Sequence, residues 1–342
     1  MPDAVGGISS QEKMMLNNPL PRIDSSPDIR DKLLPHCRLK LGQIWTDPLM
    51  GHRVGCLDAS DPEHVREIMS KDTAQLAIHD PPYNVAVFGR MPLADYVQWC
   101  QSWVSNTLAV LNDDSSLYVW LGADQNDGFK PLPDFIVMMR NQPLSPRSII
   151  TMRNQRGYGT QKNWMAVRQE LLYYTRGKPK FHVDAEYTDI PKILRGYYKK
   201  VNGQVTDNLQ RGRGSTIRAG NVWVDIQQVF YRMEENVSGC YAQKPLKCIE
   251  RIIRASSSPN NLVIDYFAHS GTTLIASEKL QRKCYTLDID PIYAEITIRR
   301  LERLRTTGKT GWQNGNPFEN DVVDLKQLPD AASGVNAQAA LF

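Results

Sequence analysis

The sequence lacks several features that mark particular classes of protein. None of the 342 residues starts a run of about 18 apolar residues, so we expect neither a transmembrane helix nor a membrane partner. The first residues contain no basic stretch followed by an apolar one, so we expect no secretory signal. The six cysteines form no Cys-x-x-Cys pair, which argues against a disulfide framework and a zinc site. Reduced thiols in a cytoplasm fit this pattern better.

The composition is that of an ordinary globular chain, with 41% hydrophobic and 23% charged residues. The length suggests about two domains, or one large α/β domain with insertions. Basic residues are concentrated in one region, because residues 176–218 contain ten basic and four acidic side chains, a net charge of +6. A local basic excess indicates a polyanion partner, although a solvated loop with ordinary surface lysines gives the same pattern.

Short apolar runs alternate with stretches of helical spacing from residue 57 onward. The apolar runs predict strands at 74–79, 116–121, 148–153, 169–175, 261–267 and 283–288. The spacing predicts helices at 62–70, 93–111, 133–141, 244–256, 272–281 and 291–305. Strands that alternate with helices indicate an α/β fold with a parallel sheet covered on both faces. Residues 1–35 are predicted to be a polar extension, part of it mobile, and the chain from residue 307 a disordered tail.

The most specific feature is Asp80-Pro81-Pro82-Tyr83, which directly follows the strand predicted at 74–79. Each proline fixes its own φ and pushes the residue before it into an extended conformation, so the loop is stiff. It presents a carboxylate, a backbone carbonyl and an aromatic ring on one frame. That combination suits a planar amine, because the two oxygens accept its N–H groups while the ring stacks on its face. An ordinary Pro-Pro turn is the alternative.

A second feature is a predicted strand that runs into a turn and then a helix, over residues 263–273. Backbone N–H groups and the positive end of the helix can face an anionic group at such a turn. Asp265 and Phe267 would line a pocket there. The turn itself would be formed by Ser270, Gly271 and Thr272. The next strand ends at Asp288, where an acid can bind ribose hydroxyl groups, although a generic turn explains the loop alone equally well.

The two features, with a basic region between them, resemble the bacterial and phage DNA amino-methyltransferases that use S-adenosylmethionine. The order, with Asp-Pro-Pro-Tyr before a motif similar to Phe-x-Gly-x-Gly, resembles their permuted β class. The resemblance covers roughly residues 40–305 and includes Lys40–Asp61, Arg168–Gly177 and Gln243–Ser256. It implies a Rossmann-like α/β fold with a doubly wound, mostly parallel sheet and an inserted target-recognition region.

The resemblance also implies functional residues. The catalytic residues would be Asp80, Pro81, Pro82 and Tyr83. The cofactor S-adenosylmethionine would be bound by Asp58, Gln243, Lys244, Asp265, Phe267, Ser270, Gly271, Thr272 and Asp288. Double-stranded DNA would be contacted by Lys199, Lys200, Arg211, Arg213 and Arg218. No metal ligand is implied.

The implied reaction is methyl transfer to N6 of adenine in duplex DNA, with the base flipped out of the stack. N4 of cytosine is the alternative because its amine is chemically similar, but enzymes of that type more often have Ser at the position of Asp80. Methylation of RNA or of protein glutamine fits less well. A DNA-binding protein without activity is a further reading, since His269 replaces a glycine of the family's turn and accepts a left-handed backbone less readily.

The implied organisation has five parts: an N-terminal extension (1–45), a catalytic half (46–180), the target-recognition region (181–220), a cofactor-binding half (221–305) and a flexible tail (306–342). The enzyme would work in the cytoplasm on the nucleoid, as methyltransferases of restriction–modification systems do. The sequence leaves open the recognition site, a cognate restriction enzyme, a bacterial or phage origin, and a homodimer.

The extreme C-terminus carries a short apolar motif, Gln338-x-x-Leu341-Phe342. Its spacing resembles the peptides that dock on the bacterial replication sliding clamp. Leu and Phe would be buried in the clamp's pocket, Gln would form hydrogen bonds at the rim, and the tail would act as a tether. Five residues carry little information, so a terminal sequence without function is the alternative.

Overall fold

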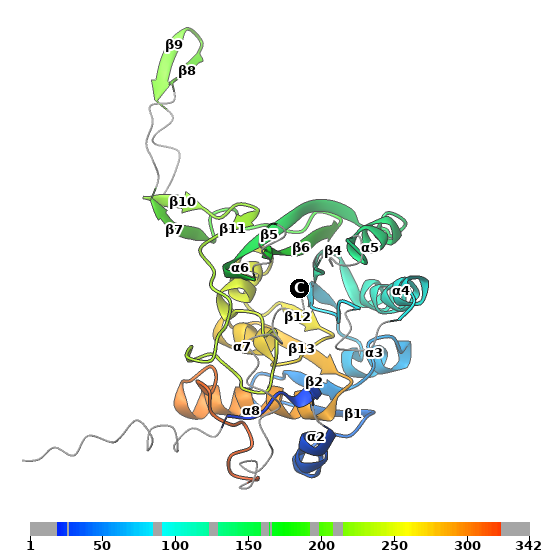
Figure 1. Cartoon of the computed structure of the whole chain (residues 1–342). Helices are drawn as coiled ribbons and strands as arrows, with labels where there is room; N and C mark the ends of the chain where they lie inside the picture. The colour runs from blue at the N-terminus through cyan, green and yellow to red at the C-terminus, as the bar shows by residue number, and fades with distance from the viewer. Residues whose placement is uncertain are drawn as a thin grey trace, which may run out of the picture.

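The computed structural model describes residues 19–25, 27–84, 91–122, 129–158, 164, 166–191, 198–207 and 215–322. In this part of the chain the centre is a nine-stranded sheet with the order β1-β2-β13-β12-β3-β4-β6-β5-β11 (Figure 1). Its strands, in chain order, are Gln43–Thr46 (β1), Arg53–Cys56 (β2), Ala74–His79 (β3), Leu111–Trp120 (β4), Ser145–Tyr158 (β5), Ala166–Arg176 (β6), Val222–Trp223 (β11), Leu262–Asp265 (β12) and Lys283–Asp288 (β13).

The middle of the sheet is parallel. Strands β2, β13, β12, β3 and β4 pair in parallel, and the register sets Asp288 opposite Cys56 and Asp265 opposite Thr286. Antiparallel pairs flank this block, with β1 on β2 at one side and β4–β6–β5 at the other. The carboxyl ends of the parallel strands therefore lie along one edge. This arrangement confirms the predicted α/β fold with a mostly parallel sheet.

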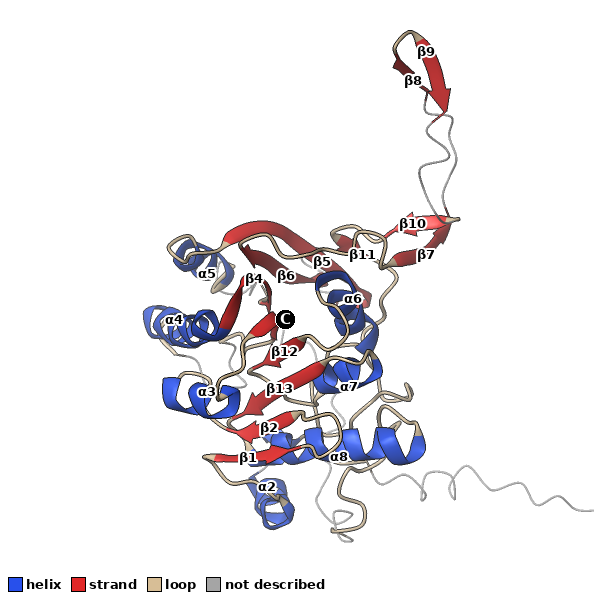
Figure 2. Cartoon of the chain, turned by 180° about the vertical axis from the view of Figure 1, so that it is seen from behind, coloured by secondary structure: helices blue, strands red, loops and turns tan. Residues whose placement is uncertain are grey.

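Helices cover both faces of the sheet (Figure 2). The helices on one face are α3 (Pro62–Met69), α4 (Leu93–Val110) and α5 (Leu132–Met139). Those on the other face are α6 (Leu246–Ser256), α7 (Thr272–Lys279) and α8 (Pro291–Thr307). The predicted helices are confirmed to within about two residues at their ends, and Asp61 caps α3 by accepting a hydrogen bond from the Glu63 amide at 2.8 Å.

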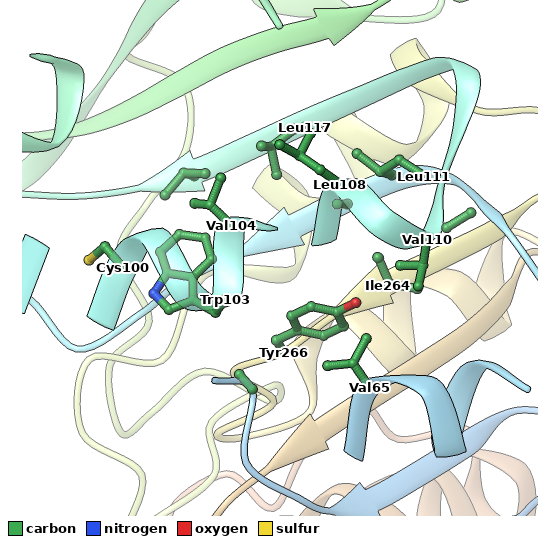
Figure 3. Packing of buried hydrophobic residues seen from close by; sticks show 14 of the residues in the cluster. Val65, Cys100, Trp103, Val104, Leu108, Val110, Leu111, Leu117, Ile264 and Tyr266 are labelled. Atoms are coloured by element: carbon green, nitrogen blue, oxygen red, sulfur yellow. The ribbon is translucent and has the colours of Figure 1, made fainter. Parts of the chain in front are cut away.

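The strands have apolar side chains on both faces, as buried parallel strands require. In β4, Leu117 and Val119 join the core cluster under α3 and α4, whereas Tyr118 and Trp120 join the cluster under α6 and α7. Successive side chains of a strand point to opposite faces, so one apolar run supplies two cores. Figure 3 shows the first cluster, in which Trp103 of α4 lies with residues of β4, β12 and α3.

The region between β6 and β11 contains two small sheets. Tyr187–Pro191 (β7) pairs with Thr216–Arg218 (β10), and Tyr198–Val201 (β8) pairs with Gln204–Asp207 (β9). The sequence shows only weak periodicity here. Among the described residues, no helix combines the length and the apolar character needed to span a membrane.

The segments before β1 and after α8 pack against each other. The N-terminal segment contains α2 (Pro27–Leu33), flanked by the 3₁₀ turns Ile23–Ser25 and Leu34–His36, and α2 lies near the β1 edge of the sheet (Figures 1 and 2). Ile23, Leu33 and Phe318 are fully buried in a third core cluster, together with Ile292 and Ile296 of α8. The expected disorder from residue 307 is therefore wrong for the described residues up to 322, because burial of Phe318 anchors them.

Candidate active site

Four loops meet at the edge where the parallel strands end. Asp80 follows β3, Phe267 follows β12, Asp288 ends β13 and Asp58 follows β2. Because these strands are neighbours and parallel, residues far apart in sequence come together there. The crevice outside the carboxyl ends of the strands is the general position of ligand sites in such sheets.

The Asp80–Tyr83 loop is held by side-chain hydrogen bonds. The Tyr83 hydroxyl donates to Asp80 Oδ1 at 2.8 Å, and the Tyr96 hydroxyl of α4 donates to the Pro82 carbonyl at 2.6 Å. The Pro81 carbonyl accepts no hydrogen bond within the described part of the chain. The loop thus presents the carboxylate, the carbonyl and the ring that the sequence analysis expected to act together.

Lys244 lies against the Asp80 carboxylate. Its Nζ is 2.6 Å from Asp80 Oδ2, and it also lies over the rings of Tyr83 and Trp120, at 5.5 and 5.3 Å from the ring centroids. The side chain is 9% exposed. Lys244 is predicted from the sequence to bind the cofactor, and the structure places its ammonium against the Asp80 carboxylate.

A cavity of about 600 Å³ opens at this edge. Residues of both predicted sites line it: Asp80, Pro81, Pro82 and Tyr83 from the catalytic loop, and Asp58, Lys244, Phe267 and Asp288 from the cofactor set. Further lining residues that sequence reasoning missed include Asp24, Arg30, Trp99, Tyr241, Asp290 and Tyr293. Five members of the predicted cofactor set lie outside the lining of this cavity, among the described residues: Gln243, Asp265, Ser270, Gly271 and Thr272.

The buried Asp265 holds the turn between β12 and α7 through hydrogen bonds. Its carboxylate accepts hydrogen bonds from the Phe267 amide at 3.0 Å and from the Thr273 hydroxyl at 2.5 Å, and it is 5% exposed. Burial raises the pKa of this carboxyl to about 7, although the hydrogen bond from Thr273 acts in the opposite direction. Asp265 therefore ties the end of β12 to the first turn of α7.

The rest of the turn is packed on α8. Gly271 has φ +74°, and a Cβ there would lie 2.9 Å from Thr297 Oγ1 and 3.0 Å from Thr297 Cα. The buried Arg300 donates hydrogen bonds to the Ser270 carbonyl at 2.8 Å and the Thr272 hydroxyl at 3.0 Å. These contacts set the shape of the turn, which explains why the side chains of Ser270 and Thr272 are buried in the protein.

His269 takes the left-handed conformation that favours glycine, with φ +47°. Its amide donates to Asp288 Oδ2 at 2.8 Å, and its ring lies 4.8 Å from that of Tyr293. Burial lowers the pKa of the imidazole to about 4, so the ring is neutral at pH 7. Burial also raises the pKa of the Asp288 carboxyl, to about 7. The turn therefore forms although His269 stands where the family has a glycine.

Two further residues position the site. Gln243 accepts a hydrogen bond from the Val237 amide at 2.9 Å and donates one to the Glu235 carbonyl at 2.8 Å, so it holds the loop that delivers Lys244. His79 is buried, and its Nδ1 accepts from the Tyr266 amide at 3.2 Å. Burial lowers the pKa of the His79 imidazole to about 3. This neutral ring joins the end of β3 to the end of β12.

The comparison with known sequences identifies the protein class. The sequence profile of the DNA methylase family, of the N6 and N4 type, matches residues 74–299. The chain belongs to this family. It is therefore an enzyme, a DNA amino-methyltransferase with S-adenosylmethionine as methyl donor. The resemblance to the DNA amino-methyltransferases is confirmed.

Individual relatives share about a quarter of their residues with this DNA methylase. The Type II methyltransferase M1.MboII of Moraxella bovis is 29% identical over 270 residues, which cover 73% of this chain and 96% of the relative. The DNA adenine methyltransferase YhdJ of Escherichia coli is 26% identical over 243 residues, 68% of this chain and 77% of the relative. The structure of the cytosine-N4-specific PvuII DNA methyltransferase shares the fold, with a TM-score of 0.51 and 16% identity. The match covers 72% of this chain and 84% of the PvuII chain.

The cavity of the methylase suits its cofactor. S-adenosylmethionine combines a flat adenine, ribose hydroxyls, a positive sulfonium and an amino-acid end. The cavity offers the aromatic rings of Trp99 and Phe267 for the adenine, and the acids Asp58 and Asp288 for hydroxyl, amine or cationic groups. Its volume of about 600 Å³ is in the usual range for small-molecule sites. The lining residues present therefore fit the group.

The residues expected to bind DNA are only partly described. Lys199 and Lys200 lie on β8, and Arg218 is exposed on β10, opposite Tyr187 of β7. Arg211 and Arg213 lie outside the described residues, as do Gln338, Leu341 and Phe342 of the C-terminal motif.

Proposed function

We propose that this methylase modifies N6 of adenine at specific sites in duplex DNA, as an enzyme of the β class. The observation that carries the proposal is the Asp80–Tyr83 loop at the rim of the cofactor cavity, with an acid as its first residue. The adenine must leave the stack for its amine to reach this loop. N4 of cytosine is the alternative target, because its amine offers the same two hydrogens.

The loop's oxygens would hold the target amine. Asp80 and the Pro81 carbonyl accept its two hydrogens and hold them out of the plane of the base, which makes the nitrogen lone pair more available. Each Asp80 oxygen has two lone pairs, so it can accept a hydrogen from the amine while Tyr83 and Lys244 keep their own contacts. The Tyr83 ring supports the face of the base. Lys244 orients the carboxylate.

Catalysis would then consist mainly of positioning. When bound, S-adenosylmethionine supplies an electrophilic methyl group on its sulfonium. The loop must hold the amine nitrogen about 3 to 3.5 Å from that carbon and in line with the bond that breaks. The acids Asp58 and Asp288, with Phe267, Gln243, Lys244, Asp265, Ser270, Gly271 and Thr272, bind the cofactor directly or shape its site.

The remaining partners are part of the same proposal. Lys199, Lys200, Arg211, Arg213 and Arg218 contact the DNA backbone, supported by the net charge of +6 in residues 176–218. The Gln338–Phe342 motif tethers the enzyme to the replication sliding clamp, and the enzyme works on the nucleoid in the cytoplasm. The proposal also includes a homodimer of the chain.

The decisive experiment is methylation-aware sequencing of DNA from cells that express the chain, with mass spectrometry of the hydrolysed nucleosides. We expect N6-methyladenine at one short sequence, and none with Asp80→Ala. Transition-state stabilisation of about 1.4 kcal/mol is worth tenfold in rate, so this variant should retain less than a tenth of wild-type turnover. N4-methylcytosine instead would establish the alternative target. Absence of any new methylated base would contradict both.

Calorimetry with the same variant separates chemistry from binding. Asp80→Ala should still bind S-adenosylmethionine with nearly wild-type affinity, because other residues supply most of the cofactor site. A variant that loses both cofactor binding and turnover would show that Asp80 acts on the cofactor rather than on the base.

A further inference from the structure

A segment outside the matched family region forms part of the cofactor cavity. The family profile matches residues 74–299, yet Asp24 and Arg30 contribute side chains to the cavity lining. They belong to residues 19–25 and 27–36, which we call the N-terminal strap. The sequence contains no motif here, and its polar, proline-rich character predicted only an extension.

The strap is anchored by apolar burial. Ile23, Ile29 and Leu33 are at most 3% exposed and belong to one cluster with Ile292 and Ile296 of α8. Burial of apolar side chains is the main stabilising contribution to a fold, so these three side chains hold the strap in place. The strap is therefore a fixed wall of the site.

Hydrogen bonds join the strap to the loop that precedes Lys244. The Ile23 amide donates to the Gly239 carbonyl at 3.2 Å, and the Leu20 amide donates to the Ser238 hydroxyl at 3.0 Å. Gly239 has φ +85°, and a Cβ there would lie 2.7 Å from the Leu20 side chain. The strap and the loop therefore lie so close together at this point that a side chain at position 239 would collide with Leu20.

Ion pairs fix the two lining residues of the strap. Arg22 binds both oxygens of Asp24 and lies over the ring of Tyr241, which also lines the cavity. Arg30 Nη1 donates to Asp290 Oδ2 at 2.5 Å. The Asp290 amide in turn donates to Asp288 Oδ1 at 3.0 Å. Arg30 is therefore connected to the acid placed for ribose.

The Arg30 guanidinium has N–H groups that are available to a ligand. In the described part of the chain, no hydrogen bond occupies its Nε or Nη2, and the side chain is 34% exposed. A guanidinium offers five N–H donors in a rigid plane and accepts nothing, so its free donors match oxygen acceptors on a ligand.

We propose that Arg30 binds the ribose oxygens of S-adenosylmethionine, and that the N-terminal strap is a built part of the cofactor site. The inference rests on the assignment of that cofactor. Ribose is the acceptor group because Arg30 is held by Asp290, next to Asp288 at the end of β13. S-adenosylhomocysteine has the same ribose, so Arg30 acts equally on substrate and product.

Calorimetry on the full-length chain tests the proposal with both ligands. Arg30→Ala should weaken binding of S-adenosylmethionine and of S-adenosylhomocysteine by about fivefold or more. Lys32→Ala is the matched control, because Lys32 is an exposed cation on the same helix and is outside the cavity lining; it should bind within about twofold of wild type. Equal affinities of the two variants would overturn this inference alone. A wild-type chain that binds neither ligand would overturn the cofactor assignment as well.

Hydrogen exchange on the unmodified protein gives an independent readout. Addition of S-adenosylmethionine should slow amide exchange in residues 19–36 as well as in the turn 266–272. Protection of the turn without any protection of the strap would overturn the proposal, whatever the fold of the Arg30 variant.

Discussion

The ammonium of Lys244 lies 2.6 Å from Oδ2 of Asp80, 164 positions earlier in the chain. Asp80 directly follows β3, whereas Lys244 lies two residues before α6. The Lys244 carbonyl accepts a hydrogen bond from the Thr272 hydroxyl at 3.3 Å. The pair therefore joins the Asp80–Tyr83 loop to the turn at Ser270–Thr272. The side chains are 9% and 25% exposed, so each charge depends on the other for compensation.

A double-mutant cycle on this pair should show strong coupling. Asp80→Asn and Lys244→Met should each lower the free energy of unfolding by about 1–2 kcal/mol, because each leaves one charge without its partner. The double variant should lose clearly less than the sum. Urea unfolding measures the three values. The exposed pair Glu63–Arg66 serves as control and should show almost no coupling. Additive losses at Asp80 and Lys244 would contradict the interpretation.

Substitutions of His269 should depend on what the backbone allows. Because φ at this position is +47°, His269→Gly should keep cofactor affinity at or above the wild-type level. His269→Val should destabilise the turn by about 1–3 kcal/mol, because a β-branched residue resists this conformation. Calorimetry and thermal unfolding on both variants provide the test. If His269→Gly binds S-adenosylmethionine tenfold more weakly, a loss of about 1.4 kcal/mol, the imidazole makes a specific contact.

Stability should depend on pH through Asp265. Its folded-state pKa, raised by burial to about 7, exceeds the value of about 4 in an unfolded chain. Between these values the folded protein binds more protons than the unfolded chain, so this residue's contribution to stability is lost as pH rises. Asp265→Asn cannot ionise. Its free energy of unfolding relative to wild type should therefore increase from about pH 5 to about pH 8. A difference that stays constant across this range would contradict the raised pKa.

Neutralising Arg211, Arg213 and Arg218 together should weaken DNA binding and flatten its salt dependence. Each lost phosphate contact should reduce the slope of log K against log salt by about 0.9. Fluorescence anisotropy titrations at several salt concentrations give this slope. A variant with Lys40, Lys71 and Lys309 neutralised carries the same charge change at exposed positions elsewhere and should keep the wild-type slope. An unchanged slope in the arginine variant would place the DNA surface elsewhere.

A labelled peptide of residues 330–342 should bind purified sliding clamp with micromolar affinity, about −8 kcal/mol. Leu341→Ala with Phe342→Ala should abolish that binding, because the two side chains supply the buried apolar area. In the full-length enzyme the same change should leave methylation of short duplexes at the wild-type level. No binding at about 100 μM clamp, or a loss of activity on short duplexes, would contradict the tether.

Much of the site could be predicted because its signals are local. Prolines at 81 and 82 restrict the backbone wherever they stand, and apolar runs mark the strands whose ends carry Asp80 and Asp288. The turn 269–272 was also visible, but whether each of its side chains faces the cavity was not. That direction depends on Arg300 and Thr297 of α8, which pack against the turn from far along the chain.

Residues close together in the chain are enough to indicate the family, to predict the central strands and the helices around them, and to show that the Asp80–Tyr83 loop is stiff. The meeting of Lys244 with Asp80, and the place of the strap residue Arg30 in the cavity wall, follow instead from contacts between segments far apart in the chain. Parallel pairing and apolar burial bring such segments together although more than a hundred residues separate them in the chain. A contact of that kind leaves no periodicity and no motif in either segment.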